Sequence, residues 1–196
     1  KVDGYNLCSD TQCQVYKDPS KANQKIKIAI KKTAGKILTW NQKPINTVYH
    51  ATNGGVMASV DEAWSTNQVP YLQTRLDGPK HWSRKVDLPL SNEQYLKSFL
   101  FSESEAFGSD HPLFRWNRTL ESSQISKQLT QAQKVTSTFD PKKIHAVSRG
   151  SSGRVTSLQI EGKTGSEILL KVDDIRRVLR QLPSTLFVVK EIKEGK

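Results

Sequence analysis

The last third of the chain carries the pattern that most restricts the fold. Residues 143–148 and 154–161 are rich in apolar and β-branched residues and are separated by glycines and serines. This arrangement predicts two strands joined by a tight turn. A second turn at 162–165 leads into a third expected strand, 167–172. Strands joined by such short connections pair antiparallel, so this region predicts a small antiparallel sheet.

A helix and one more strand are expected after these strands. Asp173 can cap the start of a helix. Its apolar residues recur at positions i, i+3, i+4 and i+7, which places them on one face: Ile175, Val178, Leu179 and Leu182. Pro183 then ends the helix, and residues 185–189 predict a final strand.

The first part of the chain predicts a helix followed by a hairpin. Apolar residues at four-residue spacing favour a helix over 20–34, and Gly35 stands where a left-handed residue commonly ends one. Residues 36–40 and 44–50 then predict two strands around a three-residue turn. The second strand runs into the paired glycines Gly54 and Gly55, which permit unusual backbone angles and close approach of other groups.

The middle of the chain, 61–115, is the least regular stretch, with prolines and aromatic residues interspersed. Such a stretch is typical of a binding rim or of plain connections. Helices are expected at 91–100 and 120–133. Together these patterns predict an α+β fold: a mixed, largely antiparallel β-sheet with a few packed helices.

The charge balance limits the partners. Of the 196 residues, 30 are Lys or Arg and 19 are Asp or Glu, a net charge of +11. This favours an anionic partner such as nucleic acid, anionic lipid or an acidic cell-wall polymer, although a solvated basic surface explains it as well. The basic residues are scattered, and no nucleic-acid motif is present, so we expect no nucleic-acid partner. No apolar run approaches the roughly 18 residues that span a bilayer, so we expect no membrane span.

The two cysteines, Cys8 and Cys13, are close in sequence. They could form a disulfide, supply half of a metal site, or remain free thiols. Zinc sites usually need four ligands, and no second Cys/His pair stands at zinc-finger spacing.

Five segments follow one another along the chain in a distinctive order. The most specific is Tyr49-His50-Ala51-Thr52-Asn53-Gly54-Gly55. In this order, the segments resemble the SpoIID/LytB family (stage II sporulation protein D and amidase enhancers). The other four segments lie at 8–16, 62–72, 149–155 and 175–187.

This resemblance implies lytic cleavage of peptidoglycan glycan strands, with a preference for strands stripped of stem peptides. It also implies an extracytoplasmic location, in the periplasm or cell wall, and a SpoIID-like groove for a linear sugar polymer. Related members enhance cell-wall amidases, so an amidase is a further expected partner. The alternative is a non-catalytic wall-binding or amidase-enhancer module.

The chemistry requires a carboxylic acid that keeps its proton near neutral pH and protonates the leaving oxygen. In the family that glutamate precedes the cysteine-containing segment, and this sequence contains no such stretch. We therefore expect a single SpoIID/LytB-like domain without its N-terminal part, unable by itself to release anhydro-sugar ends. Its expected parts are a groove-forming half (1–80), an irregular insertion (81–115) and a C-terminal α/β half (116–190).

The resemblance also indicates residues that bind the glycan. His50, next to Tyr49, either faces the groove and hydrogen-bonds a sugar or orients the acid, or it caps a loop. Asn53 is a polar sugar contact or a turn residue. Gly54 and Gly55 let the glycan approach or simply form a tight turn.

Two aromatic residues, Trp64 and Tyr71, are candidates for stacking on sugar rings, or they are half-buried core residues. Glu62 is the nearest carboxylate, but we expect it to be a solvated or cap-like residue. In some relatives the cysteine pair joins histidines to hold zinc. Because Gln12 stands where a histidine often precedes the second cysteine, a Cys8–Cys13 disulfide is favoured, and we expect no metal and no cofactor.

Overall fold

The computed structural model describes residues 18–64 and 67–191. The chain divides into two compact units, Lys1–Thr47 and Val48–Lys196, and each is described by itself. The boundary falls inside the segment 1–80, which the sequence analysis expects to be the groove-forming half of the domain. Whether the whole chain acts as one domain stays a prediction.

The first unit contains the predicted helix. After a short 3-10 turn, η1 (Pro19–Lys21), helix α1 spans Gln24–Thr33. The Asn23 side chain accepts a hydrogen bond from the Ile26 N–H at 3.0 Å, which caps the first turn. Gly35 has a φ of +70°, the left-handed geometry that ends a helix. The helix prediction is confirmed, although none of the residues of α1 is buried.

The predicted hairpin follows. Strand β1 (Thr39–Trp40) pairs antiparallel with β2 (Lys43–Pro44). Asn41 and Gln42 connect them with φ values of 49° and 62°, as two-residue hairpin turns require. The hairpin prediction is confirmed, but the strands are shorter than expected, and residues 45–50 form no strand.

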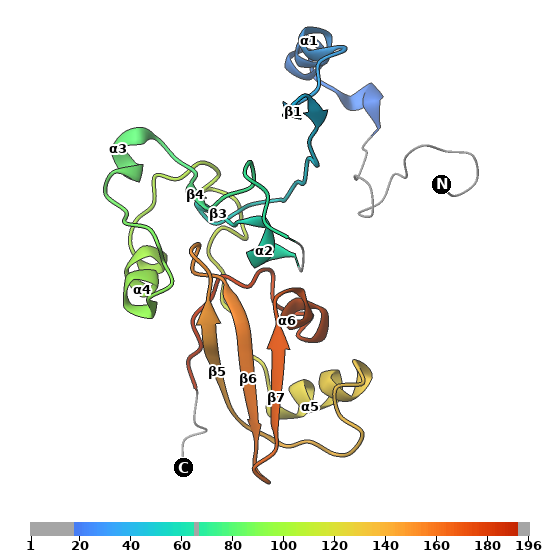
Figure 1. The fold of residues 1–196 in the computed structure, drawn as a ribbon, viewed down its shortest axis with the longest axis vertical. Coiled ribbons are helices and arrows are strands. Elements are labelled where there is room, and N and C mark those ends of the chain that lie inside the picture. Colours follow the sequence, from blue (N-terminus) through green and yellow to red (C-terminus); the bar gives the residue numbers. More distant parts are fainter. Residues whose placement is uncertain (1–17, 65–66, 192–196) are drawn as a thin grey trace, which may run out of the picture. The chain divides into compact units, whose positions relative to one another are not determined.

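The second unit contains the three strands expected in the last third of the chain. Strands β5 (Pro141–Arg149), β6 (Val155–Gly162) and β7 (Glu167–Lys171) form one antiparallel sheet in the order β5-β6-β7 (Figure 1). The strand predictions are confirmed, with ends that differ by at most two residues from those expected.

One face of this sheet packs on two helices. Leu158, Ile160 and Leu170 are buried against helix α5 (Ser122–Gln131) and helix α6 (Asp173–Val178). Helix α6 ends earlier than its sequence period suggests. Leu179 and Leu182 are nevertheless buried in the same cluster, so the periodicity identified the core residues better than the helix end.

A second hydrophobic cluster lies among short elements, of which the sequence analysis expected only the helix at 91–100. Strand β3 (Val56–Met57) pairs antiparallel with β4 (Arg75–Leu76). Helices α2 (Val60–Ala63), α3 (Lys80–Ser83) and α4 (Glu93–Phe101) lie in the same part of the chain. The buried residues of the cluster are Val56, Trp82, Leu90, Leu96, Phe99, Ala106, Phe114 and Leu186. With its helices and three small antiparallel sheets, the chain has the predicted α+β fold.

The predicted final strand at 185–189 is wrong. These residues form no strand, yet their side chains alternate. Leu186 and Val188 pack on the second cluster, whereas Phe187 and Val189 pack on the first. The segment therefore produces a strand-like pattern because it joins two cores, not because it extends a sheet.

Within the described ranges, the helices lack the combination of length and apolar character that a bilayer span needs. The longest, α1 and α5, have 10 residues each, about half of what a membrane span needs.

Replacing a core residue of the sheet should destabilise the second unit far more than replacing a surface residue. Leu158→Ala removes a buried side chain and leaves a cavity, so we expect a loss of about 2–5 kcal/mol in the free energy of unfolding. Leu169→Ala changes an exposed residue of the neighbouring strand and should cost under about 0.5 kcal/mol. Urea titrations followed by circular dichroism measure both. Equal losses would contradict the assignment of the sheet's buried face.

Candidate functional site

An open cleft of about 1750 Å³ runs along the second unit. One part of its wall is formed by residues 48–54, which include all of the segment 49–55 singled out in the sequence except Gly55. Five of the seven predicted glycan-binding residues line it: Tyr49, His50, Asn53, Gly54 and Trp64. Gly55 and Tyr71 are not among the lining residues.

The side chains best placed to meet a ligand are those before the glycines and at the end of α2. His50 is exposed, and Tyr49 and Trp64 expose 49% and 41% of their surface. Exposed aromatic side chains on a concave wall can pack against an apolar ring face, and an imidazole can donate or accept a hydrogen bond. Binding of glycan by these residues stays a prediction.

Asn53 is buried, and its amide is engaged at both ends. Its Nδ2 donates to Asp77 Oδ2 at 2.6 Å, and its Oδ1 accepts from the Gly55 N–H at 2.9 Å. The side chain therefore shapes the turn that precedes β3. To contact a sugar, it would have to exchange one of these partners.

The paired glycines let the protein's own side chains approach closely. Gly54 and Gly55 have φ values of 70° and 92°. A Cβ on Gly55 would lie 2.9 Å from the Cβ of Ala106, and one on Gly54 would lie 3.3 Å from the Leu186 side chain. The glycine turn therefore packs tightly on the second hydrophobic cluster.

All four backbone carbonyls of residues 53–56 accept hydrogen bonds from within the protein. Arg154 donates to the carbonyls of Asn53 at 3.0 Å and Val56 at 3.1 Å. Arg115 donates to the carbonyl of Gly54 at 2.9 Å, and the Asp77 N–H donates to that of Gly55 at 3.0 Å. These carbonyls hold the turn inside the protein, and the exposed side chains that this wall offers to a ligand, Tyr49 and His50, lie before it.

Arg154 is buried beside the equally buried carboxylate of Glu62. Burial lowers the pKa of Arg154 to about 10, and the negative charge of Glu62 acts in the opposite direction. The guanidinium thus remains charged at neutral pH. A buried charge of this kind is tolerated because carbonyls and a nearby carboxylate compensate for the lost hydration.

Glu62 anchors the turn between β5 and β6. Its carboxylate accepts hydrogen bonds from the Ser152 N–H, from the Ser152 hydroxyl, and from the Thr74 hydroxyl at 3.3 Å. Gly150 has no side chain, which leaves room for Glu62, because a Cβ there would overlap the carboxylate. The expectation of a solvated Glu62 is wrong, because the side chain is buried. Its carboxylate accepts a backbone N–H as a cap does, but from the β5–β6 turn and not from a helix end.

Arg115 joins the glycine turn to the end of α4. Besides the Gly54 carbonyl, it donates to the carbonyls of Leu100 at 3.0 Å and Phe99 at 3.3 Å, in the last turn of the helix. Its guanidinium lies over the ring of Phe114, 4.2 Å from the centroid. Burial lowers its pKa. A positive charge at this helix end also suits the helix dipole.

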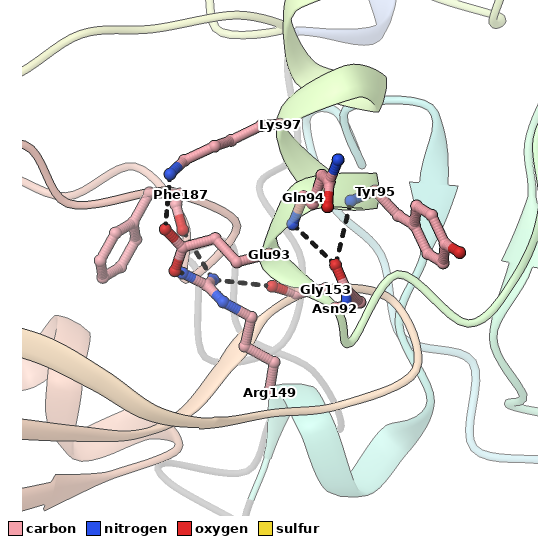
Figure 2. A network of polar contacts seen from close by, with 8 residues as sticks. All are labelled: Asn92, Glu93, Gln94, Tyr95, Lys97, Arg149, Gly153 and Phe187. Carbon is pink, nitrogen blue, oxygen red and sulfur yellow. Dashed lines mark hydrogen bonds and ion pairs between the residues drawn. The ribbon is translucent and has the colours of Figure 1, made fainter.

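The start of α4 is held by a third arginine (Figure 2). Arg149 donates to the carbonyls of Gly153 at 3.1 Å and Phe187 at 2.7 Å, and forms an ion pair with Glu93 at 3.2 Å. Lys97, one helical turn away, also pairs with Glu93 at 2.9 Å. This network ties the β5–β6 turn to α4 and to the segment that joins the two cores.

Cations outnumber anions in the cleft. The charged lining residues are Arg115, Arg118, Lys142, Lys143, Arg154, Arg176 and Lys190 against Glu121, Asp173 and Glu191. The excess favours a ligand with negative charge.

In the part of the chain that the structure describes, no group of three or more His, Cys, Asp or Glu side chains is placed to hold a metal ion. Cys8 and Cys13, with the expected disulfide, lie outside the described residues.

Some residues that build the site carried no clear signal in the sequence. Arg149 and Arg154 could be noticed because they flank Gly150–Gly153, but their carbonyl partners could not. Nothing around Arg115 or Asp77 marks them as anchors of the glycine turn, because their partners lie far away in the sequence.

Removing the buried guanidinium should destabilise the second unit strongly. Arg154→Met leaves two buried carbonyls without their donor and removes the positive charge near the buried Glu62, so we expect a loss of about 3–5 kcal/mol. Arg118→Met is the matched control, because this exposed residue donates to the carbonyl of its neighbour Asn117. It should cost under about 0.5 kcal/mol. A loss that small for Arg154→Met in chemical denaturation would refute its anchoring role.

The ion pairs of Glu93 should make part of the stability depend on pH. Hydrogen bonding from Lys97, then that from Arg149, lowers the pKa of Glu93 from its ordinary value of 4.5. A lowered pKa in the folded state means that the contribution is complete above about 4.5 and is lost as the pH falls below it. We expect the stability difference between wild type and Glu93→Gln to shrink over this acidic range. A constant difference in urea titrations from pH 6 to 3 would contradict this.

Two family models match different parts of the chain. Residues 1–40 match the stage II sporulation protein model (SpoIID), and residues 58–196 match the model described as a domain of unknown function (DUF8618). A curated relative, stage II sporulation protein D of Bacillus amyloliquefaciens, is 32% identical over 112 residues. That match covers 51% of this chain and 30% of the relative, so the chain spans less than a third of the relative's length. No solved structure matches the chain.

The resemblance to SpoIID proteins seen in the sequence motifs is thus confirmed by a family model and by a relative. The longer match covers the second unit from α2 onward. Because it includes more than two thirds of the 196 residues, the chain belongs to the family described as a domain of unknown function (DUF8618).

Proposed function

We propose that the cleft of the second unit binds glycan strands of peptidoglycan, outside the cytoplasm. The observation that carries this proposal is the exposure of Tyr49, His50 and Trp64 on the wall of one open cleft. The similarity to a stage II sporulation protein D supports a role in the cell wall.

The chemistry of the cleft suits such a ligand. Pyranose rings have apolar C–H faces that pack on aromatic side chains, and hydroxyls that bond to an imidazole. Glycan strands without stem peptides carry a free carboxylate on each muramic acid, which the excess of cleft cations can attract. This binding requires no cofactor.

We also propose lytic cleavage of the strand, as a reaction that needs a segment carrying the family's catalytic glutamate. The proton donor would be a glutamate on a segment like the one that carries the catalytic glutamate in the SpoIID/LytB family. Glu62 does not suit this role, because its carboxylate already accepts hydrogen bonds from Ser152 and Thr74. That commitment also favours the second candidate function: a wall-binding or amidase-enhancing module that does not itself turn over glycan.

Removing the exposed cleft side chains should weaken binding without unfolding the protein. For Tyr49→Ala and His50→Ala, we expect at least a fivefold weaker affinity for denuded glycan strands, or about 1 kcal/mol, measured by isothermal titration calorimetry. Tyr95→Ala is the control, because Tyr95 is exposed on α4 and is not among the cleft-lining residues. Failure of the wild type to bind, or equal affinity in all variants, would reject the proposal.

A further inference from the structure

The last residue of α4 is an exposed aromatic. Phe101 exposes 78% of its surface, the highest value among the exposed large hydrophobic residues of the described chain. Its helix buries Leu96 and Phe99 in the second hydrophobic cluster, so Phe101 points away from the core that stabilises α4. A phenyl ring that is mostly exposed to water adds little to that core.

Phe101 also lines the cleft that Tyr49 and His50 line. Another strongly exposed phenylalanine, Phe107, follows six residues later and is not among the lining residues. An exposed phenylalanine of this region therefore need not lie on the cleft wall, and Phe101 differs from Phe107 in doing so.

The backbone that carries Phe101 is fixed relative to the glycine turn. Arg115 binds the carbonyls of Phe99 and Leu100, directly before Phe101, and with the same guanidinium binds the carbonyl of Gly54. This arginine is held in turn by the Phe114 ring beneath it. The helix end with Phe101 and the turn that follows Tyr49 and His50 are thus held by one charged group.

We infer that Phe101 is a further glycan-contacting residue, whose ring stacks on a sugar of the strand, and that Arg115 is its positioning residue. This inference rests on the proposed function and extends it to a second aromatic position on the cleft wall. Stacking needs a flat apolar surface in a fixed orientation, which a ring on an anchored helix end supplies. A sugar polymer fits this wall better than a protein partner, because the neighbouring lining residues combine single aromatics with polar and cationic groups.

The test uses the whole chain and chitin oligosaccharides together with denuded glycan strands as probes. Phe101→Ala should weaken binding at least fivefold in calorimetry, with an unchanged melting temperature, since the side chain is exposed. Phe101→Trp keeps a flat ring and should retain binding. Phe107→Ala is the matched control and should bind as the wild type does.

Arg115→Lys tests the positioning role. Lysine keeps the charge but cannot bridge the three carbonyls as a planar guanidinium does. We expect the affinity of this variant to fall, and the further loss on adding Phe101→Ala to be smaller than in the wild-type background. A full additive loss would show that Arg115 does not position Phe101.

The outcomes separate this inference from the proposed function. If Tyr49→Ala weakens binding and Phe101→Ala does not, the cleft binds glycan and the inference about Phe101 is wrong. If the wild type binds neither probe, the proposed function fails. If Phe101→Ala and Phe107→Ala weaken binding equally, general surface hydrophobicity accounts for the effect and the inference is again wrong.

Discussion

The site depends on one buried positive charge. Arg154 binds the carbonyls on either side of the glycine pair, and the neighbouring Glu62 anchors the turn from which Arg154 emerges. Both side chains are buried, so each compensates for part of the hydration that the other has lost. The glycine turn and the β5–β6 turn are therefore fixed together, although about 100 residues separate them in sequence.

Two more arginines also join separate segments, in a region that has few hydrogen bonds between strands. Arg115 occupies the last carbonyls of α4, and Arg149 bonds to the carbonyl of Phe187. Strands β3 and β4 have two residues each, too few to hold these loops by ladder bonds alone. Guanidinium groups suit this task because several donors in one plane reach carbonyls of different segments.

The two ends of the segment 49–56 therefore have different roles. From Asn53 onward the backbone carbonyls are bound inside the protein, whereas Tyr49 and His50 remain exposed on the cleft wall. Residues that look like one motif in the sequence therefore serve two purposes. The glycines fix the turn against Ala106 and Leu186, and the exposed side chains before them are available to a ligand.

Local pattern in the sequence determined the helix α1, the hairpin after it, and the sheet β5-β6-β7. Their signals, such as a four-residue apolar period or runs of apolar and β-branched residues between glycine turns, act over a few residues. The tertiary structure alone decided the pairing of β3 with β4, the cleft itself and the partners of Glu62, Arg115 and Arg154. It also showed that residues 185–189 form no strand. Their side chains point alternately into the two hydrophobic clusters. The reason is physical: a buried charge is placed by distant carbonyls, and no local pattern encodes which carbonyls those are.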